Sequence, residues 1–193
     1  MDNLTFAIWR SPFGWIGLAA NDRGMVAITT PRALRRLALA DLRTLIGPQG
    51  TAGENQFICA ARDELERYFN RDPRADLGRI QLDLERGTPL QRRYWQLLRK
   101  IPYGETRTYG ELARVLGRPG AARAIGQCNA RNPWAIVVPC HRVVGENASL
   151  TGYGGGLEMK RRLLELEGIQ VTALRAMRLA AARQRRRGDA HRN

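Results

Sequence analysis

Short runs of apolar side chains alternate with polar turns at the start of the chain. Residues 4–9, 15–20 and 25–28 are rich in β-branched, aromatic and other apolar side chains. Ser-Pro-Phe-Gly at 11–14 and Asn-Asp-Arg-Gly at 21–24 separate them. Pro and Gly supply the backbone conformations that tight turns need. The pattern predicts a three-stranded antiparallel meander, which we interpret as scaffold.

The apolar spacing then becomes helical. Residues 32–45 are rich in Leu, Ala and Arg, and residues 57–69 carry apolar side chains three and four positions apart, so each segment predicts a helix. A loop is expected over 47–53. Apolar and polar side chains alternate again over residues 80–84, which predicts a further strand. The composition changes near Arg86, where we place a domain boundary.

Capping residues mark two helices in the second half. Thr88 precedes a proline, an arrangement typical of a helix start, and predicts a helix over 90–101. Thr108 and Glu111 have the spacing of a capping box and predict a short helix over 109–116.

A second short helix is predicted over 121–130, after an Arg-Pro-Gly turn. Two short helices joined by a tight turn make a helix-turn-helix. Such pairs often only pack against each other. Here, however, small residues surround Arg123, so the helix could approach a DNA groove closely and insert one long cation.

The most distinctive stretch is residues 136–144, where β-branched runs flank Pro-Cys-His-Arg. The runs predict a buried strand, broken or bulged at Pro139 because proline has no N–H to donate. The break places Cys140 next to an imidazole and a guanidinium. Positive neighbours lower the pKa of a thiol, and the thiolate is the nucleophile. The alternative interpretation is an inert cysteine in a core strand.

The chain is strongly basic. Its 193 residues carry a formal net charge of +14. Residues 174–193 contribute +6, from seven arginines and one aspartate, so the rest of the chain is basic too. The positive electrostatic field favours binding to a polyanion. We expect nucleic acid first and an anionic membrane surface second.

Cysteine and histidine usage points to a reducing compartment. The three cysteines are an odd, sparse set, and the first residues lack the pattern of a signal peptide. We therefore expect a cytoplasmic protein without disulfides. No apolar run approaches the length of a membrane span. With two histidines and no paired-cysteine spacing, no structural zinc is expected.

A glycine-rich loop at 152–156 precedes a predicted helix over 157–167, which Gly168 ends. A phosphate-binding P-loop is disfavoured, because the G-x-x-x-x-G-K-[ST] pattern is not met. Residues 171–187 are interpreted as a basic helix or a tail. The tail is either a non-specific DNA tether or a solubilising segment.

Several motifs then occur together in a family-specific order and spacing. They are Tyr-Gly-Glu-Thr at 103–106, Tyr-Gly-Glu-Leu-Ala at 109–113, Ala-Ala-Arg-Ala-Ile-Gly at 121–126, Asn-Pro at 132–133, Pro-Cys-His-Arg-Val at 139–143, Gly-Tyr at 152–153, Lys160, Leu-Leu at 163–164 and Glu-Gly at 167–168. In these motifs the chain resembles the O6-alkylguanine-DNA alkyltransferases, also called methylated-DNA–protein-cysteine methyltransferases. The resemblance is dense over 87–168 and loose before it.

The resemblance implies an α+β fold in three parts. Residues 1–86 would form a small antiparallel sheet with helices. Residues 87–170 would form a mostly helical alkyltransferase domain, with a helix-turn-helix and a short active-site strand. Residues 171–193 would be a basic tail, longer and richer in arginine than the family requires.

The resemblance also assigns catalytic roles. Cys140 would accept the alkyl group and keep it. His141 would draw the thiol proton through a water, and Glu167 would orient His141. Tyr109 would donate a proton to guanine N3, and Asn132 would position the site at the hinge between helix and strand.

Further residues would contact DNA or the substrate. Arg123 would fill the gap left by a flipped nucleotide. The other DNA-facing residues would be Ala121, Ala122, Gly126 and Thr108. The substrate pocket would be lined by Val143, Tyr153, Gly154 and Ala135.

The expected partner is double-stranded DNA that carries O6-alkylguanine, with O4 of thymine as a further site. No cofactor, metal or membrane is expected, and the protein would be a monomer without DNA. The family's zinc ligands and phosphotriester-repair module have no counterpart here, and the acceptor is cysteine rather than the tryptophan of some relatives.

Two other functions are kept open. A non-catalytic damage sensor or helix-turn-helix regulator would not need the thiol. A Cys-His hydrolase would turn over repeatedly and would need an oxyanion hole.

Overall fold

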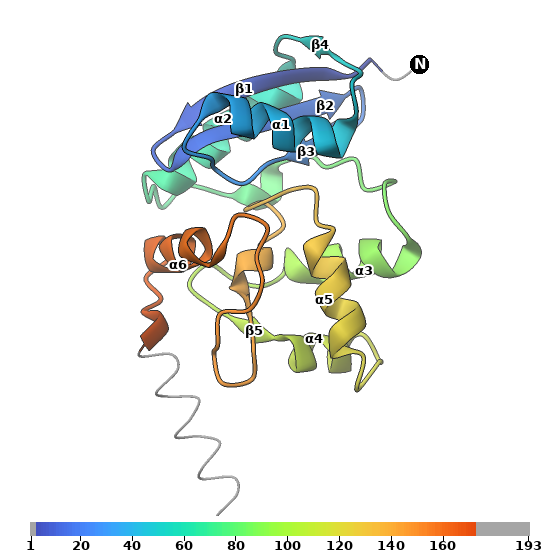
Figure 1. The fold of residues 1–193 in the computed structure, drawn as a ribbon, viewed down its shortest axis with the longest axis vertical. Coiled ribbons are helices and arrows are strands. Elements are labelled where there is room, and N and C mark those ends of the chain that lie inside the picture. The colour runs from blue at the N-terminus through green and yellow to red at the C-terminus, as the bar shows by residue number, and fades with distance from the viewer. Residues whose placement is uncertain (1–2, 173–193) are drawn as a thin grey trace, which may run out of the picture. The chain divides into compact units, whose positions relative to one another are not determined.

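The structure is a computed structural model that describes residues 3–172, in two compact units. The first unit takes residues 3–100 and 128–140, and the second takes residues 101–127 and 141–172. Figure 1 shows the chain as a ribbon, with most of its helices and strands labelled. The domain boundary near Arg86 stays a prediction, and the basic tail from residue 173 lies outside the described residues.

The N-terminal meander is confirmed. Its antiparallel strands are β1 (Thr5–Ser11), β2 (Gly14–Asn21) and β3 (Gly24–Ile28). Gly24 has a φ of +148°, and a β-carbon there would lie 2.9 Å from the carbonyl oxygen of Gln81, so the turn requires glycine. The predicted loop over 47–53 contains a short strand, β4 (Thr51–Ala52), which pairs in parallel with β1.

One helix covers each face of this sheet. Side chains alternate between faces along a strand, so Phe6 and Trp9 of β1 point in opposite directions. Phe6 packs in a cluster with Leu42 of α1 (Arg35–Ile46). The ring of Trp9 lies 6.3 Å, between centroids, from that of Phe69 in α2 (Gln56–Phe69).

The strand predicted over 80–84 is wrong. The segment follows a short 3-10 helix, η1 (Leu77–Arg79), and forms a single bridge between Met25 and Leu82. After this bridge the backbone turns, with Leu84 N donating to Leu82 O at 3.1 Å, and the buried Asp83 carboxylate accepts hydrogen bonds from Asn21 and Arg23. The alternation therefore reflected the burial of Ile80 and Leu82 around the exposed Gln81 rather than a strand.

Four further helices are confirmed, and two of them begin directly after the predicted caps Thr88 and Thr108. They are α3 (Pro89–Leu98), α4 (Tyr109–Val115), α5 (Ala122–Ala130) and α6 (Leu157–Leu166). Capping boxes form at Thr88 with Gln91 and at Thr108 with Glu111. In the second unit β5 (Arg107–Thr108) pairs in parallel with β6 (Val143–Val144).

The strand predicted over 136–144 is mostly wrong. Only Val143 and Val144 form a strand, and Cys140–Arg142 is a 3-10 helix, η2. Before them the backbone turns tightly: Val138 N donates to Trp134 O at 2.9 Å, Cys140 N donates to Val138 O at 2.7 Å, and Ile136 has a φ of +72°. The β-branched side chains are buried all the same, and burial is what β-propensity largely measures.

The segment before Cys140 is hydrogen-bonded to strand β3 within the first unit. Ile28 N donates to Pro133 O, and Ala135 N donates to Ile28 O. The fully buried Trp134 indole donates to Met25 O at 2.7 Å. Its ring meets that of Trp95 edge-on, 5.3 Å between centroids.

In the described part of the chain, no helix has the length and apolar character needed to cross a bilayer.

We predict that Trp134→Phe lowers the free energy of unfolding by about 1–3 kcal/mol, because the Met25 carbonyl would lose one of its two buried donors, keeping Asp83 N, and the smaller ring would leave a cavity. Chemical denaturation measures this loss. Trp9→Phe is the control, because the Trp9 side chain is only half-buried. Equal losses in the two variants would contradict the anchoring role of Trp134.

Candidate active site

Asn132 holds the Cys140 thiol in the first unit. Its Nδ2 lies 3.2 Å from Cys140 Sγ and 2.8 Å from Val138 O, and its Oδ1 accepts from Trp134 N at 3.0 Å. Cys140 is buried, with 7% of its surface exposed. A donor on sulfur favours the thiolate over the thiol. The predicted hinge residue therefore contacts both the sulfur and the backbone that carries it.

Asn129 is a second amide near the thiol that the sequence analysis missed. It lies near the end of α5, where its Oδ1 accepts from the buried Tyr94 hydroxyl at 2.9 Å. Its Nδ2 lies 3.5 Å from the carbonyl oxygen of Cys140. A polar residue among the small side chains of this helix, just before Asn132, was the available signal.

His141 is completely buried in the second unit. Its Nε2 lies 2.8 Å from Glu167 Oε1, as the predicted orienting role requires. Burial lowers the pKa of His141 and outweighs the opposing pull of Glu167. His141 Nδ1 is buried and has no hydrogen-bond partner among residues 3–172. The ring is thus neutral at neutral pH and, with Nε2 donating to the carboxylate, keeps a lone pair on Nδ1.

Arg142 fixes the carboxylate that orients His141. Its Nε and Nη2 each donate to one oxygen of Glu167 at 2.9 Å, and its Nη1 donates to Ile101 O at 2.6 Å. Burial opposes ionisation of Glu167, but the hydrogen bonds from His141 and Arg142 and the positive charge of Arg142 prevail and lower the pKa of this carboxyl group to about 2. The sequence analysis treated Arg142 as a positive neighbour of the thiol; the structure instead commits its guanidinium to Glu167.

Tyr109 begins α4, and its Oη lies 3.3 Å from Thr151 Oγ1. The loop that carries Thr151 also carries two predicted pocket residues, Tyr153 and Gly154. Val143 is buried in β6 of the same unit. Ala135, the fourth predicted pocket residue, is buried in the first unit.

The predicted DNA-facing residues differ in exposure. Ala122 and Arg123 of α5 are exposed, and Ala121 and Gly126 are half-buried. Thr108 is buried, and its hydroxyl accepts from Glu111 N. The contact that the structure gives Thr108 is therefore the cap of α4, while its DNA-facing role stays a prediction.

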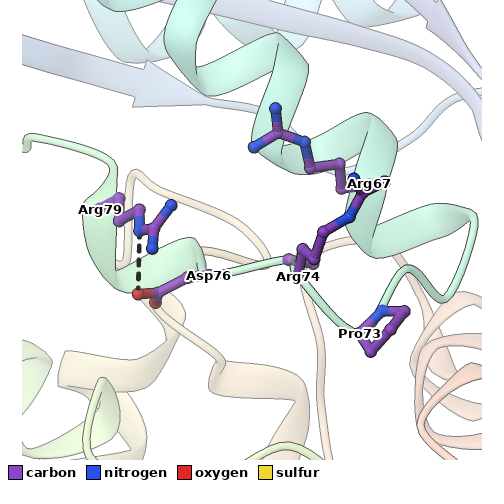
Figure 2. A pocket seen from close by; sticks show the side chains of 6 residues that line it. Arg67, Pro73, Arg74, Asp76 and Arg79 are labelled. Atoms are coloured by element: carbon purple, nitrogen blue, oxygen red, sulfur yellow. Dashed lines mark ion pairs between the residues drawn. The ribbon is translucent and has the colours of Figure 1, made fainter.

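A hollow of about 540 Å³ elsewhere in the first unit is lined by three arginines, which makes it a candidate anion site. Figure 2 shows the side chains that line it. Each guanidinium already has a carboxylate: Arg67 pairs with Glu64, Arg74 with Asp72 and Arg79 with Asp76. Because the charges are paired, the hollow offers an anion little net attraction. It contains none of the predicted site residues.

Several known proteins are similar to this chain in sequence and in fold. A family profile described as "6-O-methylguanine DNA methyltransferase, DNA binding domain" matches residues 89–169. A methylated-DNA–protein-cysteine methyltransferase of Methanosarcina acetivorans is 41% identical over 84% of this chain and 97% of its own length. The crystal structure of Mycobacterium tuberculosis O6-methylguanine methyltransferase is 40% identical, with a TM-score of 0.68 over 85% of this chain and 92% of that one. The structure of Mycobacterium tuberculosis OGT in complex with DNA has the same TM-score and identity, over 84% and 92%. The α+β fold predicted from the sequence is confirmed, and the chain belongs to the methylated-DNA–protein-cysteine methyltransferase family.

Proposed function

We propose that this protein repairs DNA by direct reversal, moving an alkyl group from O6 of guanine to Cys140 in a single, irreversible turnover. One observation carries the assignment of residues. His141, next in sequence to Cys140, is buried and neutral, with Nε2 on an ionised carboxylate and Nδ1 left as a proton acceptor. Such a base can take the thiol proton.

The reaction balances without a cofactor. The sulfur of Cys140 forms the new S–C bond, and the electron pair of the broken O6–C bond goes to guanine. Guanine N3 takes a proton from Tyr109. The thiol proton passes to His141 Nδ1 through a water and later returns to Tyr109 through solvent. The alkylated cysteine is not regenerated.

DNA is the partner in this proposal. A displacement at O6 has no room inside a stacked duplex, so the nucleotide is flipped out. The exposed Arg123 on the small-residue face of α5 fills the gap, and the neighbouring positions Ala121, Ala122 and Gly126 allow close approach. O4-alkylthymine is a further substrate. The protein acts as a monomer in the cytoplasm and binds damaged DNA at the nucleoid.

The first prediction tests the function itself. After incubation with excess duplex containing O6-methylguanine, mass spectrometry should find one methyl group per protein, on the Cys140 peptide. Cys140→Ser should bind DNA but take up no methyl, because a hydroxyl is a far weaker nucleophile at neutral pH. Repeated turnover would indicate a hydrolase instead, and unimpaired function in Cys140→Ser would indicate a sensor.

The second prediction concerns pH. Because burial holds the pKa of His141 below its usual 6.5, the ring should stay neutral, and able to accept the thiol proton, as the pH falls to 6.5 and below. The transfer rate to the free base O6-benzylguanine should therefore decline only at lower pH. A pH–rate profile between 5 and 8, with His141→Gln as the control that loses this limb, measures the effect. An acidic limb centred above 6.5 would contradict the neutral-base assignment.

The third prediction separates flipping from chemistry. Arg123→Ala should slow repair of duplex DNA by roughly tenfold or more while leaving the rate on free base unchanged, because free base needs no extrusion. Arg35→Ala removes the same charge from an exposed position of α1 and serves as the control. Equal losses on both substrates would show that Arg123 acts elsewhere.

A further inference from the structure

The Thr151 hydroxyl reaches a residue to which the family resemblance gives a proton-donor role. Thr151 lies in the loop between β6 and α6, far along the chain from α4. Its Oγ1 lies 3.3 Å from the phenol oxygen of Tyr109, with Thr151 as the donor. Both residues belong to the second unit. The sequence analysis gave Thr151 no role.

A buried lysine holds Thr151 in place. Lys160 of α6 is completely buried, and its Nζ donates to Val143 O at 2.5 Å and to Thr151 O at 3.1 Å. A buried ammonium group is stable only when it is hydrogen-bonded. The carbonyl groups of Val143 and Thr151 are therefore both held by the Lys160 ammonium group. The backbone of Thr151 is thereby fixed relative to β6, the strand that follows the Pro-Cys-His-Arg motif.

The start of the loop directs the Thr151 side chain. Gly145 N donates to Ser149 O, and Ala148 N donates to Gly145 O, which closes a compact turn. A β-carbon on Gly145 would lie 2.2 Å from Ser149 Oγ and 3.4 Å from the methyl carbon of Thr151. Glycine therefore lets the turn pack closely. The methyl group of Thr151 lies against this turn while its hydroxyl reaches Tyr109.

From this geometry we infer that Thr151 is a positioning residue for Tyr109, which directs the phenol proton toward the leaving guanine. A phenol oxygen that accepts a hydrogen bond from Thr151 points its own proton elsewhere. The same bond stabilises that oxygen as it gains negative charge during proton transfer, since hydrogen bonds in a chain strengthen one another. The inference rests on the proposed function and adds a residue to its proton-transfer path.

Thr151→Val and Thr151→Ser form a matched pair of variants. Valine keeps the shape of threonine without the hydroxyl, and serine keeps the hydroxyl without the methyl. Single-turnover rates are measured on two duplexes. One carries O6-methylguanine, and the other carries its 3-deaza analogue, in which a C–H replaces the N3 acceptor.

Thr151→Val should slow transfer from O6-methylguanine by roughly five- to tenfold, the range of one ordinary hydrogen bond. Thr151→Ser should restore most of the rate. On the 3-deaza duplex, and in a Tyr109→Phe background, Thr151→Val should have no further effect, because the proton path through Tyr109 is already lost.

A merely structural role gives a different pattern. If Thr151→Val slows both duplexes equally, or if serine is as slow as valine, the inference is overturned. Methyl transfer to wild-type Cys140 tests the proposed function separately. If wild-type protein takes up no methyl group, the proposed function is wrong. If wild-type protein takes up the methyl group and Thr151→Val does so at the same rate, only the role of Thr151 is wrong.

Discussion

The site depends on one buried carboxylate. Glu167 binds His141 through one oxygen and Arg142 through both, and Gly104 N lies 3.3 Å from Oε2. Desolvation alone would neutralise such a group, so the carboxylate stays ionised only because of these donors. Arg142 balances its charge, which lets His141 stay neutral although it touches an anion. The imidazole is thereby kept in one orientation and one tautomer, ready to accept a proton.

The thiol depends on a different part of the chain. Pairing with β3 and the Trp134 indole anchor the segment before Cys140, and Asn132 joins that segment to the sulfur. The residues on either side of the Cys140–His141 peptide bond are thus stabilised by separate sets of contacts. The N-terminal sheet of the first unit therefore matters for the chemistry, because it supplies the surface on which the segment with Cys140 is held.

Local signals in the sequence were sufficient for much of the fold. Caps at Thr88 and Thr108 are decided by contacts within four residues, so the helix starts could be predicted. That residues 80–84 and 136–142 do not form strands could not be predicted, because burial of alternating or β-branched residues does not reveal whether a partner strand exists. Motif spacing found His141 and Glu167, and the structure brings them together. The contacts that Asn129 and Arg142 make depend on tertiary packing, so the sequence could not predict them.

The protonation state of His141 tests this account most directly. The chain has two histidines, His141 and His191, so nitrogen-15 NMR of histidine-labelled protein, with His141→Gln for assignment, resolves the relevant ring. At pH 7 the account predicts a neutral His141 with its proton on Nε2 and an unprotonated Nδ1. A charged ring, or a proton on Nδ1 of a neutral one, would contradict it.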